Sequence, residues 1–299
     1  MKKFLLVMSG LFGLCGVAAL ALPMQAFAQP PATAPLPHGP CARAELQAAV
    51  DSYLAAQQSG DASKMSFTEK PKLSENMNEI PPEAGHWTRP MKIDFSRSFL
   101  DVDRCKTFSE VIIAHASADP KGNDRPYVIG TRLTVQGGKI AALDSLVTRP
   151  GDWLFNAANY LKFSSTEDWH ALSAAERIPK QRLIDAGDAY LDEFSDKFVE
   201  PPWGSPCARL EGGAYTDAKH DPKSTCKVGI PPGTLYIVNR DYVVDEEQGV
   251  VNIFCRFGNS QTGMPDSHTF RLVNGKLRYV HTLSVANTGR EVPQARDIP

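Results

Sequence analysis

The chain has 299 residues, with 32 Lys and Arg against 34 Asp and Glu, a formal net charge of −2 and 42% hydrophobic residues. This balance, without any basic run, argues against a nucleic-acid partner. The sequence also lacks a Walker loop, a dinucleotide fingerprint, a Gly-x-Ser-x-Gly elbow and a Cys-x-x-Cys pair, so ATPase, dehydrogenase and serine-hydrolase functions have no support.

Residues 1–28 predict a secretory signal peptide. They combine a basic start, an apolar run and a small-x-small cleavage site, formed by Lys2 and Lys3, Phe4–Leu22 and Ala26–Ala28. A Pro- and Ala-rich leader, residues 29–40, follows. We therefore expect a secreted or periplasmic protein without a stable membrane anchor.

Five cysteines remain after the signal segment, and in an exported protein they favour disulfides with one thiol left over. We pair Cys41 with Cys105 and Cys207 with Cys226, so that each half of the chain contains one bridge. Cys255 stays free. It alternates with apolar residues in a strand pattern, which is typical of a buried, inert thiol.

The two halves of the mature chain repeat with an offset of 137 residues. Leu46–Leu54 matches Leu183–Leu191, with Leu, Asp, Tyr and Leu recurring, and Gly138-Lys139-Ile140 matches Gly275-Lys276-Leu277. Such self-similarity indicates two copies of one fold. We assign residues 41–160 to the first domain and residues 161–299 to the second.

Each half reads as helix followed by strands, which is an α+β arrangement. The predicted helices are Ala44–Gln58 and Arg182–Phe194. The predicted strands are Met91–Val102, Thr107–Ala116, Tyr127–Val135, Lys139–Val147, Leu235–Asp245, Val250–Arg256, Ser267–Val273 and Lys276–Ala286. Ser165–Asp168 resembles the cap of a short helix that ends at Pro179. Residues 200–232 read as an insertion of the second half, which we place over a pocket mouth.

The chain resembles the cone-shaped fold of nuclear transport factor 2 and the SnoaL-like cyclases, in tandem. More closely, it is similar to a family of secreted fungal and bacterial proteins of largely undefined function, which have two such halves. The resemblance rests on GDWLFNA (151–157), AGDAYLDEF (186–194), PWGSPCARLEGG (202–213), NRDYVVDE (239–246) and PDSHTFRLVNGKLRYVHT (265–282). It implies two helix-on-curved-sheet domains, each with a pocket at one end.

The strongest site signal is the hairpin around Asn274-Gly275, a dipeptide typical of type I′ turns. A regular ladder from this turn places His268 opposite His281 and Phe270 opposite Tyr279, with Asp266 on the same face. We predict His281, His268 and Asp266 as catalytic residues. The alternative is that both histidines are ordinary surface or core residues. In the first half, Thr131, Asp144 and Ile129 occupy the corresponding positions, so we assign that half a structural or lid-forming role.

Further residues complete the predicted site. Tyr190 lies on the apolar stripe of its helix and is a catalytic candidate, although a core position is the simpler explanation. The predicted substrate-binding residues come from the hairpin, the insertion and the family motifs; they are Tyr279, Phe270, Trp203, Arg209, Glu211, Asn239, Arg240 and Phe254.

Three functions fit these residues. The first is a cofactor-free lyase or hydrolase that acts by general acid–base catalysis on a small aromatic molecule, for example a phenolic β-aryl ether of the lignin type. The second is a non-catalytic small-molecule binding protein. The third is a metal-dependent enzyme that uses His268, His281 and Asp266. We expect no cofactor and no metal for the first function. A monomer and a homodimer both remain open.

Overall fold

The computed structural model describes residues 41–115, 125–229, 235–258 and 262–286. The chain divides into two compact units, residues 1–34 and 35–299, and all described residues belong to the second. The predicted signal peptide (1–28) and leader (29–40) lie outside the described residues. Within the described ranges, no helix combines the length and the hydropathy that a membrane span requires.

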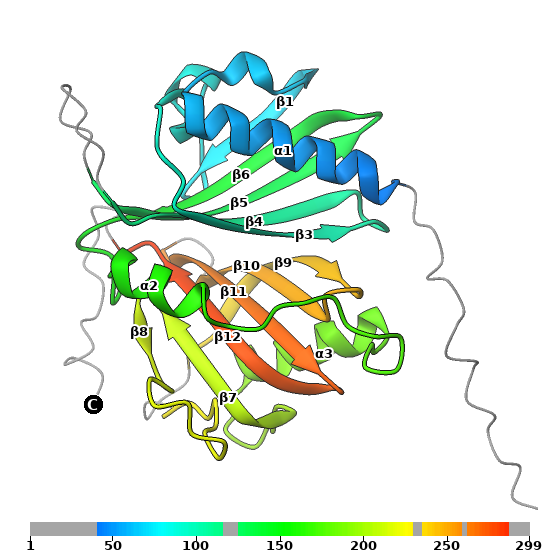
Figure 1. The fold of residues 1–299 in the computed structure, drawn as a ribbon, viewed down its shortest axis with the longest axis vertical. Helices are drawn as coiled ribbons and strands as arrows, with labels where there is room; N and C mark the ends of the chain where they lie inside the picture. Colours follow the sequence, from blue (N-terminus) through cyan, green and yellow to red (C-terminus); the bar gives the residue numbers. More distant parts are fainter. Residues whose placement is uncertain (1–40, 116–124, 230–234, 259–261, 287–299) are drawn as a thin grey trace, which may run out of the picture. The chain divides into compact units, whose positions relative to one another are not determined.

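The first half contains one long helix and a six-stranded sheet of order β2-β1-β6-β5-β4-β3 (Figure 1). Its elements are α1 (Arg43–Ser59), β1 (Phe67–Glu75), β2 (Asn78–Glu79), β3 (Phe95–Asp101), β4 (Lys106–Ile113), β5 (Tyr127–Gln136) and β6 (Lys139–Thr148), with short 3-10 turns at Ala62–Lys64, Pro82–Ala84 and His86–Thr88.

The second half repeats this plan, with a sheet of order β8-β7-β12-β11-β10-β9. Its elements are α2 (Ala157–Ser164), α3 (Lys180–Asp192), β7 (Trp203–Glu211), β8 (Ala214–Tyr215), β9 (Ile237–Asp245), β10 (Val250–Phe257), β11 (Met264–Val273) and β12 (Lys276–Ser284). The predicted tandem of two α+β cone-like domains is confirmed, and the boundary proposed at residue 160 falls inside α2.

Four strands were not predicted, namely β1, β2, β7 and β8, and β7 changes the interpretation of residues 200–232. β7 pairs in parallel with β12, as β1 pairs in parallel with β6, so β7 is the counterpart of β1. The prediction that residues 200–232 are an insertion unique to the second half is therefore wrong for the residues of β7. Pro71 and Pro206 interrupt β1 and β7. Proline removes a ladder donor and weakens the strand signal, which explains why neither strand was predicted.

The helix expected after Ser165–Asp168 is also misplaced. α2 lies before this segment and is capped by Asn156, whose side chain accepts the backbone N–H of Asn159 at 3.0 Å. Asn is a favoured N-cap because its side-chain oxygen accepts a backbone N–H of the first turn that has no acceptor within the helix. Residues 165–179 form turns and extended chain, which leaves the Glu167 side chain available for other contacts.

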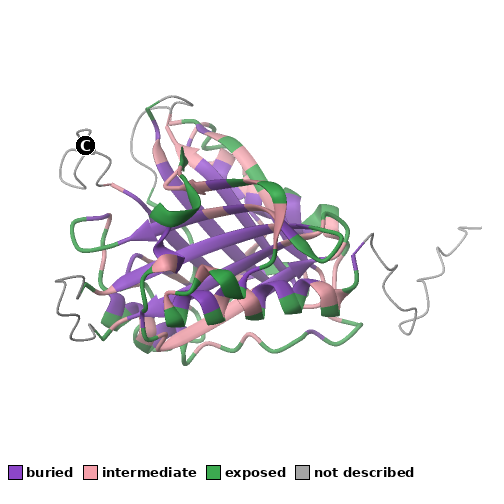
Figure 2. Cartoon of the chain, turned by 90° about the horizontal axis from the view of Figure 1, so that it is seen from above, coloured by how far each residue is buried: buried purple, intermediate pink, exposed green. Residues whose placement is uncertain are grey.

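Each sheet has one face on a helix and one face on the other sheet. α1 packs on the first sheet around Tyr53 and Ile129, and α3 packs on the second around Tyr190 and Phe270. A third cluster joins residues of both sheets, including Phe108 and Phe254. The strands are largely buried, whereas the exposed residues gather on loops and on the outer sides of the helices (Figure 2).

The β11–β12 hairpin has the predicted turn but not the predicted register. Asn274 and Gly275 have φ values of 51° and 73°, and Val273 pairs with Lys276. Leu272 pairs with Leu277, but Arg271 then pairs with Tyr279, so Arg278 is an extra bulged residue. The same shift occurs in β5–β6, where Val135 pairs with Ile140 and Thr134 with Ala142. The bulge is therefore a repeated feature of the fold.

The disulfide prediction is confirmed. Cys41 is bonded to Cys105 and Cys207 to Cys226, while Cys255 is a free, buried thiol. The first bridge ties the start of the described chain, two residues before α1, to the end of the β3–β4 turn, and the second ties β7 to the segment that follows β8. Each bridge lies within one half.

Candidate functional site

The predicted His268–His281 pair does not exist. His268 pairs with Thr282, and His281 pairs with Thr269, so the two imidazoles lie on opposite faces of the sheet. The cause is the bulge at Arg278, because one extra residue moves every later side chain of β12 to the other face relative to a regular ladder. The predicted pairing of Thr131 with Asp144 fails for the same reason, since Thr131 pairs with Ser145. The hypothetical metal set of His268, His281 and Asp266 is contradicted by this geometry.

His281 instead joins two glutamates between the sheets. Its Nδ1 lies 3.0 Å from Oε2 of Glu110 on β4, and its Nε2 lies 2.6 Å from Oε2 of Glu167 in the segment after α2. All three side chains are at most 3% exposed. The hydroxyl of Tyr160 donates to Glu110 at 2.8 Å, and the guanidinium of Arg97 lies 3.6 Å from the same carboxylate. The site is thus a buried Glu110–His281–Glu167 triad.

The triad is strongly polarised. Burial alone would lower the pKa of His281, but the two carboxylates raise it to about 9. Burial alone would raise the pKa of Glu110, but His281 and Arg97 lower it to about 2. The imidazole is consequently a cation at neutral pH and the Glu110 carboxyl is an anion. Burial and the nearby Glu110 raise the pKa of Tyr160, which keeps its hydroxyl protonated as a donor.

Glu167 places the triad at the wall of a cavity. Its Oε2 accepts the Trp169 Nε1–H at 2.8 Å as well as His281, whereas its buried Oε1 accepts no well-aligned hydrogen bond from the described residues. The cavity has a volume of about 60 Å³ and is lined by Thr166, Glu167, Pro206, Tyr215, Asp217, His220, Arg278 and Tyr279. Burial, the charge of Glu167 and a hydrogen bond to Glu167 raise the pKa of Tyr215, so this phenol stays protonated beside the carboxylate. We call this space the Glu167 cavity.

The other predicted catalytic residues lie on the helix side of the second sheet. Nδ1 of His268 is 3.0 Å from Oδ2 of Asp266, and the ring of His268 lies 5.7 Å from that of Tyr190. Tyr190 also packs edge-on against Phe270 and Trp203. Because these rings fill the space between α3 and the sheet, Tyr190 has the core position that was the simpler explanation.

Arg209 and Glu211 of β7 also belong to the second sheet, where they form an ion pair of 2.8 Å. Arg209 lies beside the Tyr190 hydroxyl, and burial raises the pKa of that phenol. The predicted residues Trp203 and Arg209 are thus near Tyr190. Trp203 and Arg209 therefore pack against α3 on one face of the sheet. The Glu110–His281–Glu167 triad lies on the opposite face.

Two predicted binding residues, Asn239 and Phe254, line a larger cavity of about 310 Å³ between the sheets; its other lining residues are Ser74, Met77, Arg132, Asp144, Ser145, Leu146, Asp241 and Arg256. Arg132 is the central cation, 2.5 Å from Asp241 and 4.7 Å from the Phe254 ring centre. We call this space the Arg132 cavity. Arg240, in contrast, binds Asp188 and Asp192 of α3.

The residues that sequence reasoning missed are Glu110, Glu167 and Tyr160. Glu110 is a charged residue inside the apolar strand Lys106–Ile113, and it is buried. A carboxylate in such a strand is a signal in itself, because an ionised group is rarely buried without a partner. Tyr160 and Glu167 gave no comparable signal.

Comparisons with known proteins cover mainly the second half. Residues 176–284, from just before α3 to the end of β12, match the family model described as a domain of unknown function, DUF8021. One solved structure that matches is an NTF-2 like protein of unknown function from Burkholderia xenovorans LB400. The match has 14% identity and a TM-score of 0.27, and covers 36% of this chain and 85% of that one. No curated protein matches the sequence.

Proposed function

We propose that the protein is a cofactor-independent lyase that acts on a small phenolic molecule, with Glu167 as the proton-transfer residue. The observation that supports this most directly is the buried Glu167 carboxylate at a cavity wall, backed by the cationic His281 and adjoined by the Tyr215 hydroxyl. Carboxylates are common general bases when they lie within reach of the proton that they remove.

The triad would hold Glu167 in one orientation. Trp169 and His281 both donate to Oε2, which fixes the position of the carboxylate. Glu110, with Tyr160 and Arg97 behind it, keeps His281 protonated and fixed. Such preorganisation removes the need for the site to rearrange during proton transfer.

In the proposed reaction, Oε1 of Glu167 removes the proton of a phenolic hydroxyl. The electron pair of the phenolate moves into the ring, a quinone methide forms, and the bond from the benzylic carbon to a leaving oxygen breaks. The leaving oxygen finally takes the proton, so the products are the quinone methide and an alcohol or phenol. No oxidant, water or cofactor is consumed. Arg278 and Tyr215 line the same cavity and would stabilise the phenolate.

The cavity volume limits the substrate. About 60 Å³ accommodates the reacting end of a molecule and not a whole aryl-ether dimer. The wall residue His220 is exposed, so the cavity reaches the surface there and a longer substrate would extend outward. The aromatic rings of Tyr215 and Tyr279 favour a flat phenolic group at the inner end.

The test uses the mature, disulfide-bonded protein and a p-hydroxybenzyl aryl ether, whose leaving oxygen is on the benzylic carbon, with the O-methylated ether as a matched substrate that has no phenolic proton. We expect turnover of the free phenol alone, in the presence and absence of chelator. Glu167→Gln should lower kcat by about 10²–10⁴-fold. Asp168→Asn is the control, since the Asp168 side chain is 69% exposed and binds only its neighbour His170 in this region. A Glu167→Gln variant with unchanged kcat would refute the proposal.

A second candidate function is the binding of an anionic aromatic ligand without turnover. The Arg132 cavity supports it, because about 310 Å³ is at the lower end of ordinary ligand pockets, which span roughly 300–1,000 Å³. Arg132 and Arg256 would face a carboxylate and Phe254 the ring. Calorimetric titration with hydroxybenzoates tests this, and Arg256→Ala should weaken any binding while Arg240→Ala should not.

We further propose that the protein is exported. The two disulfides support this, because such bonds persist in extracellular and periplasmic compartments. Fractionation of a culture that expresses the full chain would test it, by comparing the recovered mass with that expected after removal of residues 1–28.

A further inference from the structure

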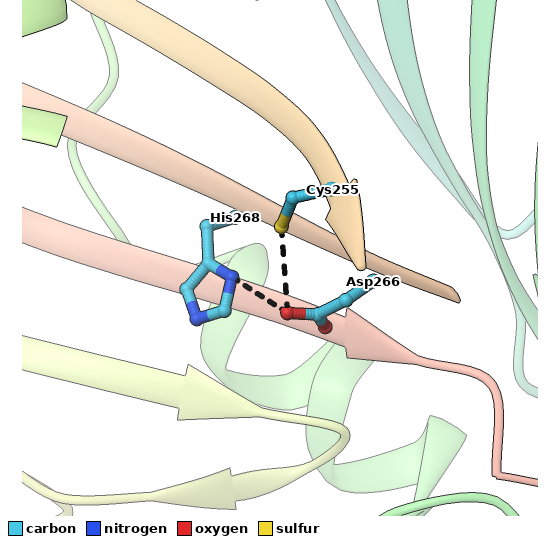
Figure 3. A group of neighbouring side chains, drawn as sticks. All are labelled: Cys255, Asp266 and His268. Carbon is cyan, nitrogen blue, oxygen red and sulfur yellow. Dashed lines mark hydrogen bonds and ion pairs between the residues drawn. The ribbon is translucent and has the colours of Figure 1, made fainter. Parts of the chain in front are cut away.

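We propose that Cys255, Asp266 and His268 form a Zn²⁺ site in the core of the second half, independent of the Glu110–His281–Glu167 triad. Cys255 on β10 pairs directly with Asp266 on β11, and His268 follows two residues later on the same face (Figure 3). One ligand atom from each residue lies within 4.8 Å of the other two. All three residues are at most 3% exposed.

The distances are close to those of a tetrahedral site. Oδ2 of Asp266 lies 3.0 Å from Nδ1 of His268 and 3.8 Å from Sγ of Cys255. Zn–S bonds of ~2.3 Å and Zn–N or Zn–O bonds of ~2.1 Å place tetrahedral ligand atoms ~3.3–3.6 Å apart. The two distances from Asp266 are therefore within about half an ångström of this geometry.

An unsatisfied polar atom points into this cluster. Nδ1 of His268 is buried and makes no hydrogen bond to any described residue; its 3.0 Å contact with Asp266 is an ion-pair contact without hydrogen-bond geometry. A buried polar atom without a partner is costly, and native structures contain few of them. Coordination to a cation would satisfy this nitrogen.

The first half shows that the fold does not need these side chains. By strand pairing, Val111 and Ile129 occupy the positions of Cys255 and Asp266, and Thr131 occupies that of His268. Thr131 is satisfied by the hydroxyl of Tyr53 at 2.7 Å, where α1 packs. An apolar pair with one hydrogen-bonded threonine is thus enough for the core. The second half has instead placed three metal-ligating groups at the same positions.

Charge and outer contacts also fit the ion. A thiolate and a carboxylate neutralise Zn²⁺, so the loaded site would have no net charge in a buried environment, where isolated charge is costly. The hydroxyl of Ser284 donates to Oδ1 of Asp266 at 2.6 Å, which orients the carboxylate and leaves Oδ2 for the metal. Such outer hydrogen bonds commonly position metal ligands. Thiolate, imidazole and carboxylate are all ordinary zinc ligands.

The test is metal binding by the mature protein with both disulfides intact. Zn²⁺ is titrated against a chromophoric chelator, and Co²⁺ is used as a spectroscopic probe. We expect one equivalent of metal and a thiolate-to-cobalt charge-transfer band. Cys255→Val should abolish the band and weaken Zn²⁺ binding by more than ~100-fold, and Ser284→Ala should weaken it by ~10–100-fold with the ligands retained.

Two controls make the result unambiguous. The triple variant Cys255→Val, Asp266→Ile, His268→Thr reproduces the first-half core, and it should stay folded without binding metal at this position; if it does not fold, Cys255→Val alone decides. His170→Ala removes an exposed histidine–aspartate pair and should leave the band unchanged. Absence of the cobalt band in the unaltered protein, or Zn²⁺ binding that Cys255→Val does not change, would overturn the proposal.

Discussion

The imidazole of His281 on β12 lies 3.0 Å from the carboxylate of Glu110 on β4, so one strand of each sheet contributes to a single buried ion pair. Glu167 approaches the other ring nitrogen at 2.6 Å. The pair is therefore both part of the contact between the two halves and the support of the Glu167 cavity. Stability and the proposed chemistry therefore both depend on the Glu110–His281–Glu167 triad.

His281→Ala should strongly destabilise the protein. Removal of the imidazolium takes away the cation that both buried carboxylates share, and breaking a buried pair in this way typically costs about 3–5 kcal/mol. Urea unfolding measures the change. His170→Ala is the matched control, because its ion pair with Asp168 is exposed and should contribute less than about 1 kcal/mol. Equal losses in the two variants would contradict the role assigned to the triad.

Stability should also depend on pH through the triad. The pKa of His281 is raised from 6.5 to about 9, so its contribution is fully present below pH 6.5 and is lost as pH rises through 9. The pKa of Glu110 is lowered from 4.5 to about 2, so its contribution is present above pH 4.5 and is lost as pH falls through 2.

The free energy of unfolding should therefore have its triad-dependent maximum between pH 4.5 and 6.5. Denaturant titrations at a series of pH values measure it. The double variant Glu110→Gln, His281→Phe should flatten the decline between pH 6.5 and 9, whereas His170→Ala should preserve it. A decline of the same size in the double variant would place its origin elsewhere.

Tyr190→Phe separates a core tyrosine from a catalytic one. Tyr190 is 1% exposed and its ring packs against Phe270 and Trp203, so loss of the hydroxyl alone should cost about 1 kcal/mol and leave turnover unchanged. Tyr190→Ala should cost about 3–5 kcal/mol, because it leaves a large cavity. Loss of kcat in a stable Tyr190→Phe variant would restore Tyr190 as a catalytic residue.

The two disulfides should differ in their effect on stability. The Cys41–Cys105 bridge spans 64 residues and the Cys207–Cys226 bridge spans 19. In the chain-entropy account, the longer loop contributes about 4 kcal/mol and the shorter about 3 kcal/mol. Thermal or urea unfolding of the variants Cys41→Ala, Cys105→Ala and Cys207→Ala, Cys226→Ala measures this. The reverse order would show that packing around β7 outweighs loop length.

The internal repeat explains how much of the fold was predictable. Periodicity identified α1, α3 and the eight antiparallel strands, since each has one apolar face. β1 and β7 escaped because prolines and polar residues obscure their alternation, and because parallel pairing with a distant strand leaves no local turn signal. The disulfides were predictable, since each half contains one pair of cysteines besides Cys255.

The site was less predictable, for a geometric reason. A bulge at Arg278 gives no glycine or proline signal, yet it decides which face His281 occupies. Its partners Glu110 and Glu167 are 171 and 114 residues away in sequence, and only the packing of the sheets brings them together. Asp266 and His268, two residues apart on one strand, were correctly placed together because that relation is local.

The repeated bulge has a consequence for how the two copies can diverge. By the 137-residue offset, Asp144 in β6 corresponds to His281 in β12, and both lie beyond the bulge on the face toward the other sheet. Asp144 lines the Arg132 cavity and accepts from Ser74 at 2.6 Å, while His281 supports the Glu167 cavity. The same β-bulge thus places Asp144 and His281, which are equivalent in the repeat, at two chemically different cavities. Substitution at one of these positions therefore changes one cavity and leaves the other half of the fold unaltered.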